Sequence, residues 1–157
     1  MNRNCIDLLL TEHDYGWNKE SWFSPLADAL ENVTASEAAW KPPHAGNTIW
    51  QTVNHLNYYN ERLLSQLTGA TGNPEVSTNE ETFGEPGDPE DHIGWRETAE
   101  RTHRIEENLR EAIAKLNESD LEDSFVEGLA AQIMHDVHHT GQIILIRKMQ
   151  GSWPAKR

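Results

Sequence analysis

MHDVHHTGQII, residues 134–144 of the chain, places three histidines and an aspartate inside an otherwise apolar run. An apolar run of this kind predicts a buried helix. Because burying so many polar groups costs free energy unless they bind something, the stretch predicts a binding site as well as a helix. His135 and His139 are four residues apart, so they project from one face of that helix, one turn apart. This is the spacing that a chelating pair needs.

The apolar periodicity around this stretch extends the predicted helix over residues 124–150. Ser124 and Glu127 form a capping-box pattern at its start, and Gly151 with Pro154 follows its end. Because apolar residues occur nearly all round this helix, we expect it to be central in the fold.

Three further segments have helical periodicity, and the chain as a whole predicts an all-α protein. The predicted long helices are residues 6–17, 48–68, 88–116 and 124–150. Capping boxes start at Thr34, for a short helical turn, and at Thr48, and a proline after Asp88 suits another helix start. A polar connection of residues 69–88 is long for a bundle. Four long helices with one long connection predict a four-helix bundle, formed as a single domain over residues 1–157.

The composition argues against several classes of partner. The chain has 26 acidic against 13 basic residues and a formal net charge of −13, which repels nucleic acid and anionic lipid. A single cysteine, Cys5, allows no internal disulfide and no multi-cysteine zinc site, and we expect it to be inert. No run approaches the roughly 18 apolar residues of a membrane-spanning helix, and no signal peptide is evident. We therefore expect a soluble, cytoplasmic protein with small-molecule partners.

Two imidazoles at this spacing suit a borderline-soft divalent ion such as zinc or nickel, and a third ligand should come from another helix. The remaining candidates are His13, His44, His55, His92 and His103. His55 is the best placed, since it lies mid-helix beside an apolar seam that also contains Asn60, and His13 is second. The other three lie in loop or polar surroundings, where we expect them to be solvated. His138, three residues after His135, is an alternative partner that spacing leaves open.

Other interpretations of these residues stand beside the metal site. A histidine on an apolar face is more often a hydrogen-bonded core residue than a ligand. Asp136 is interpreted as a surface carboxylate, with the alternative that it holds an imidazole tautomer. Gln142, Asn54 and Tyr58 are candidates for orienting ligands. The His-Glu-x-x-His motif is not met, and Glu100 with His103 supplies only part of a ferritin-like di-metal pattern.

Two stretches of the chain resemble the DinB/YfiT-like superfamily. WKP at 40–42 followed by NTIWQTVNHL at 47–56 is similar to the entry of its second helix, and HDVHHTGQI at 135–143 is similar to its last-helix motif. The resemblance covers essentially the whole chain and implies a four-helix bundle with a metal held by three histidines. Carried over by position, these are His55, His135 and His139. The resemblance, and not the spacing, favours His139 over His138.

Characterised members of this superfamily include S-transferases that use bacillithiol or related low-molecular-weight thiols, and enzymes dependent on mycothiol or glutathione. The resemblance therefore implies a thiol-dependent S-transferase acting on small electrophiles. Three imidazoles accept zinc or nickel, and also iron or manganese. The alternatives are a metal-dependent hydrolase of the same fold, or a metal- or ligand-binding stress protein without turnover. We also expect a homodimer formed through apolar helix faces.

Overall fold

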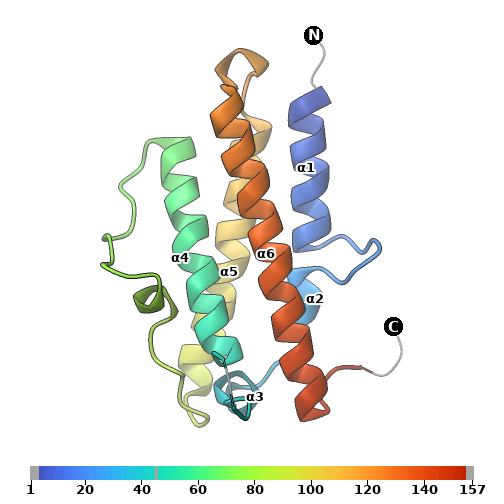
Figure 1. The fold of residues 1–157 in the computed structure, drawn as a ribbon, viewed down its shortest axis with the longest axis vertical. Coiled ribbons are helices and arrows are strands. Elements are labelled where there is room, and N and C mark those ends of the chain that lie inside the picture. Colours follow the sequence, from blue (N-terminus) through green and yellow to red (C-terminus); the bar gives the residue numbers. More distant parts are fainter. Residues whose placement is uncertain (1–3, 45, 155–157) are drawn as a thin grey trace.

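The computed structural model describes residues 4–44 and 46–154. Within those ranges all regular structure is helical, as predicted, and the four long helices stand side by side (Figure 1). The elements are α1 (Asn4–Trp17), α2 (Leu26–Leu30), α3 (Ala35–Ala39), α4 (Ile49–Thr68), the 3-10 turn η1 (Glu80–Phe83), α5 (His92–Ala114), the 3-10 turn η2 (Glu118–Asp120) and α6 (Asp123–Gln150). Contacts join α1 to α5, α5 to α4, α4 to α6 and α6 to α1, so the long helices form a closed ring.

The local capping signals set the bounds of the helix that carries His55. The Thr48 hydroxyl accepts from the backbone N–H of Gln51 at 3.1 Å, and the Gln51 side chain accepts from the backbone N–H of Thr48 at 3.1 Å. The helix ends at Gly69, whose φ of 70° is the left-handed conformation that glycine adopts without strain. The capping box predicted at Thr34 is also present and starts α3.

Two predicted helix starts are wrong. Helix α5 begins at His92 and not at Asp88, because Asp91 serves as the cap and accepts from the backbone N–H of Gly94 at 2.9 Å. Asp88 instead closes a turn that leads into the helix. Helix α6 begins at Asp123 without a side-chain cap, so Ser124 lies inside its first turn. For α5, Asp88 and Asp91 both suit a helix cap, and the local sequence does not show which of them starts the helix.

A polar layer crosses the middle of the bundle between two apolar clusters. One cluster includes Trp17, Leu56 and Ile143, and the other includes Leu9 and Ile133. Between them each long helix contributes buried polar side chains. These are His13 on α1, His55, Asn57 and Asn60 on α4, Thr102 and Glu106 on α5, and His139 and Thr140 on α6. The candidate site therefore lies in the structural centre of the protein.

The prediction that α6 is central in the fold, based on apolar residues nearly all round it, is wrong. Met134, Leu145 and Met149 on this helix are 71%, 59% and 51% exposed. In a four-helix ring each helix packs mainly against two neighbours, so the third side of α6 faces solvent (Figure 1). In the described ranges, the structure has no helix that is long and apolar enough to cross a membrane.

Candidate metal centre

Three histidines from two helices meet in the polar layer. His55 projects from α4, and His135 and His139 project from α6. One ring nitrogen of each lies within 4.8 Å of the others. The Nε2 atoms of His55 and His135 are 3.0 Å apart. Among the residues that the structure describes, no other group of three histidine, cysteine or carboxylate side chains converges in this way. The structure thus brings together the three residues that the resemblance implied.

The donor set fits a divalent metal ion. Zinc bound to imidazole nitrogens at about 2.0–2.1 Å would hold two of them about 3.3 Å apart in a tetrahedral arrangement, close to the 3.0 Å between His55 and His135. Burial lowers the pKa of His55 to about 3, and the imidazoles of His139 and His135 add to this shift. Burial also lowers the pKa of His139. Neutral imidazoles are the form that binds a metal, so the centre is prepared for one near neutral pH.

The orientation of His55 is set by the turn η1. The His55 Nδ1 atom lies 2.5 Å from the Thr82 hydroxyl, and that hydroxyl donates to the Asn79 carbonyl at 2.5 Å. Since the hydroxyl hydrogen is used on Asn79, Thr82 must accept from His55, and the proton of the neutral ring sits on Nδ1. The Nε2 lone pair is then free to point into the centre. Phe83 stacks on the same ring with a centroid distance of 4.0 Å.

His139 has the same tautomer for a similar reason. Its Nδ1 atom lies 2.7 Å from the amide oxygen of Gln142, which can only accept, so Nδ1 carries the proton. The amide nitrogen of Gln142 donates to Nε2 of His138 at 3.2 Å. His138 is exposed and points away from the convergence of nitrogens, as a neighbour of the centre. Gln142 therefore orients a candidate ligand, as the sequence suggested.

The Asp136 carboxylate lies next to the Nδ1 atom of His135. The His135 Nδ1 atom is 3.4 Å from Asp136 Oδ1, and the same carboxylate accepts from Gln132 at 3.0 Å and from Asn60 at 2.8 Å. The interpretation of Asp136 as a plain surface carboxylate is wrong, since its side chain is only 14% exposed and fully engaged. A carboxylate behind a ligating imidazole favours the Nδ1–H tautomer and raises the basicity of the ring.

A buried polar network, made of Asp136, Asn60, Glu106 and His13, continues from the centre across the bundle. Asn60 donates to Glu106 Oε1 at 2.8 Å, and Glu106 Oε2 lies 3.0 Å from Nε2 of His13. Burial raises the pKa of the Glu106 carboxyl; the hydrogen bond with His13 opposes this and the charge of Asp136 adds to it. His13, the second choice for the third ligand, is therefore a partner of Glu106 and lies outside the centre.

The other candidate residues lie away from the converging nitrogens. His44, His92 and His103 are exposed. Asn54 donates to the carbonyl of Phe83 at 3.2 Å, and Tyr58 donates to that of Pro74 at 3.5 Å. These two side chains hold the long connection against α4 and do not reach the histidines with a hydrogen bond.

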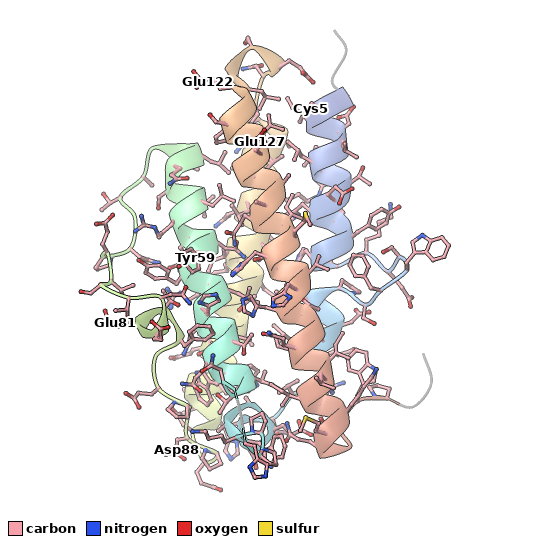
Figure 2. All side chains as sticks on the ribbon, in the orientation of Figure 1. Cys5, Tyr59, Glu81, Asp88, Glu122 and Glu127 are labelled. Carbon is pink, nitrogen blue, oxygen red and sulfur yellow. The ribbon has the colours of Figure 1, made fainter. Side chains whose placement is uncertain are left out.

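Sequence reasoning missed Thr82, Phe83 and Glu106. The first two belong to the long connection, whose turn η1 packs beside α4, where Figure 2 labels Tyr59 on the helix and Glu81 in the turn. Nothing periodic marks Thr82 and Phe83 in the sequence. Asn60 did carry a signal, because a polar residue in an apolar seam needs buried partners. One of those partners is Glu106.

The fold and the site define a class: an all-helical bundle with a three-histidine centre that could hold a divalent metal. The chain belongs to the DinB superfamily, whose family model matches residues 23–143. This range contains all three histidines and begins after α1. Comparisons with curated proteins and with solved structures found no match.

Proposed function

We propose that the protein binds a divalent metal through His55, His135 and His139 and catalyses the transfer of a low-molecular-weight thiol to small electrophiles. The observation that carries the proposal is the convergence of three imidazole nitrogens, one from each histidine, with each Nδ1 engaged by Thr82, Asp136 or Gln142. Three protein ligands leave coordination positions open for other molecules, as in catalytic sites and unlike closed structural ones.

A bound zinc, nickel, iron or manganese ion would lower the pKa of a thiol cosubstrate and so supply a thiolate at neutral pH. The sulfur forms a bond to carbon of the electrophile, the leaving group departs with its electron pair, and the thiol proton passes to solvent. The residues of the chain hold this centre on rigid elements and cover part of it. Phe83 and Tyr59 place aromatic rings against His55 at 4.0 Å and 5.0 Å, which excludes water from one side.

The experiment that tests the proposal measures metal content and thiol dependence together. Purified protein, supplemented with zinc or nickel, is analysed for bound metal and then assayed with monochlorobimane and a panel of thiols. We expect about one ion per chain and a rate that needs both metal and thiol. His135→Ala should remove both. If the protein holds no stoichiometric metal after supplementation, the three histidines are not a metal site. If the rate of product release does not depend on thiol, the protein is not a thiol transferase, and metal-assisted hydrolysis is favoured instead.

The homodimer and the cytoplasmic location remain predictions. The exposed side chains of Met134, Leu145 and Met149 on the uncovered side of α6 support pairing with a second copy, since a row of large apolar residues in water favours association. Sedimentation equilibrium of the wild type and of Leu145→Lys tests this. A monomeric wild type at micromolar concentration would rule the dimer out.

A further inference from the structure

A groove of about 280 Å³ lies between α4 and α6, and two of its lining residues adjoin His135 of the histidine centre. Tyr59 and Gln132 line the end of the groove that adjoins the centre. The ring of Tyr59 is 5.6 Å from that of His135, and the amide nitrogen of Gln132 is 3.4 Å from His135 Nδ1. From there the groove extends along α4 and toward the N-terminal end of α6, the end where Figure 2 labels Glu122 and Glu127. A molecule in the groove would therefore have one end at the centre.

Gly128 keeps the α6 wall of the groove open. Glycine inside a helix is destabilising relative to alanine, so its presence needs a reason. No neighbouring atom lies within 4 Å of where its Cβ would stand, which means that close packing is not the reason. The missing side chain leaves space instead. Leu63, Phe125 and Leu129 provide apolar surface around that space.

The charge of the groove is opposite to that of the protein. The chain has 26 acidic residues, yet among the side chains that the structure describes no carboxylate lines this groove, and Arg62 is the one cation that does. The guanidinium pairs with Glu75 of the long connection at 3.4 Å, and the Glu75 side chain is 84% exposed. Exposed ion pairs of this kind contribute little stability, so another carboxylate can replace Glu75 at small cost.

We propose that this groove binds a small organic anion, with an apolar chain along α4, a terminal carboxylate at Arg62 and the reacting end at the histidines. His55 and Arg62 are seven residues apart, about 10 Å along the helix axis. A six-carbon chain covers this separation once its terminal sulfur, its carboxylate and the contacts at both ends are included. The volume lies at the small end of ligand pockets and suits a small molecule. The inference rests on the proposed function only in placing the reacting end at the metal centre.

The test compares acids with their neutral amides by NMR titration of the full-length ¹⁵N-labelled protein. The zinc-loaded protein receives 6-mercaptohexanoate or 6-mercaptohexanamide, and the metal-free protein receives hexanoate or hexanamide. We expect each acid to bind about fivefold more tightly than its amide, as one partly exposed charge-assisted contact allows. The backbone amide of Gly128 should be among the signals that shift.

Four variants separate charge from shape. Arg62→Gln should abolish the preference for the acid, while Arg96→Gln, an equal change of charge on exposed α5 surface outside the groove, should keep it. Glu75→Gln should tighten acid binding about twofold by removing the internal competitor. Gly128→Leu should weaken acid and amide alike, about tenfold. Leucine improves helix propensity, so this loss would not come from unfolding, which a thermal melt confirms.

Equal affinities for acid and amide, or equal losses in Arg62→Gln and Arg96→Gln, would overturn the inference. Because metal content is measured separately, the experiment distinguishes a failure of the groove assignment from a failure of the proposed metal-dependent function. If zinc binds but no acid preference exists, the groove assignment falls and the metal centre stands. If zinc does not bind and metal-free protein prefers hexanoate in an Arg62-dependent way, the groove assignment stands and the proposed function falls.

Discussion

Asn60 donates to Asp136 and to Glu106, at 2.8 Å in each case, and so joins the histidine centre to a buried acid on another helix. The amide has two hydrogens, and each goes to a different carboxylate. Its oxygen accepts from Gln132 at 2.8 Å. One neutral side chain therefore holds two carboxylates apart and keeps Asp136 behind His135.

Asn60→Leu should lower both the stability and the metal affinity of the protein. Leucine fills a similar volume but removes one hydrogen-bond donor from each of two buried carboxylates, which should cost about 2–3 kcal/mol in the free energy of unfolding. Because Asp136 then loses a partner that positions it against His135, zinc affinity should fall about tenfold. Urea unfolding of the metal-free protein and competition with a chromophoric chelator measure the two effects.

Asn57→Leu is the matched control, since Asn57 is equally buried on α4 but makes one long hydrogen bond of 3.5 Å to the Thr98 carbonyl. We expect a smaller loss of stability and unchanged zinc affinity. Equal losses of zinc affinity in both variants would show that Asn60 acts through general packing and not through Asp136.

Glu106→Gln should make the metal-free protein less sensitive to rising pH. The folded state raises the pKa of this carboxyl above its ordinary value of 4.5, so above that pH the folded protein holds more protons than the unfolded chain. The contribution of Glu106 to the free energy of unfolding is therefore fully present at low pH. It is lost as pH rises through the raised pKa, by at most about 1.4 kcal/mol per pH unit. Gln keeps an oxygen for Asn60 and cannot ionise.

Urea unfolding at pH 5 and pH 8 measures this effect. The difference in the free energy of unfolding between wild type and Glu106→Gln should shift in favour of the variant at pH 8. Parallel pH profiles would mean that Glu106 does not titrate in this range.

The parts of the protein that sequence predicted well are those set by local signals. The capping box at Thr48 and the stop at Gly69 depend on residues within one turn of each other, and both are present. Helical spacing predicts a chelating pair that contains His135, and the resemblance favours His139 over His138 as its partner. The resemblance added His55, and the structure brings all three together, while their binding of a metal stays a prediction.

The parts that sequence did not reveal depend on packing between distant segments. Thr82 reaches His55 across 27 positions, from a connection without periodicity. The pairing of His13 with Glu106 joins α1 to α5 across 93 positions. His13 was the second choice for the third ligand and is buried in the structure, but its partner depends on how two helices align. No local pattern in the chain encodes that alignment.

Thr82→Val should weaken zinc binding with little effect on folding. Valine has nearly the same shape but cannot accept from His55 Nδ1, so the ring loses the contact that fixes its tautomer. Loss of such a partner typically costs 10- to 100-fold in metal affinity. Thr78→Val is the control in the same connection, because Thr78 accepts only from the backbone N–H of Glu81 and does not contact a histidine. Chelator competition should separate the two variants; equal affinities would contradict the role of Thr82.

The number of protons released when zinc binds should stay small at mildly acidic pH. The pKa of His55 is lowered to about 3, so this ring remains neutral as pH falls to 6, and burial lowers the pKa of His139 in the same direction. At most about two protons should then be released from the three imidazoles per zinc bound at pH 6, and affinity should fall no more than about a hundredfold per pH unit. Calorimetric titration in buffers of different ionisation enthalpy counts the protons. Release of about three protons would show that His55 is protonated before zinc binds.

The choice between His138 and His139 can be tested directly. His139 is 9% exposed and its nitrogen joins the convergence with His55 and His135, whereas His138 is exposed and accepts from Gln142. His139→Ala should therefore reduce zinc affinity at least 100-fold, since two imidazoles make a weak site, and His138→Ala should change it less than threefold. The two substitutions remove the same group from adjacent positions of one helix, so each controls for the other. If His138→Ala caused the larger loss, α6 would have to present a different face to α4, and the assignment of the centre would be wrong.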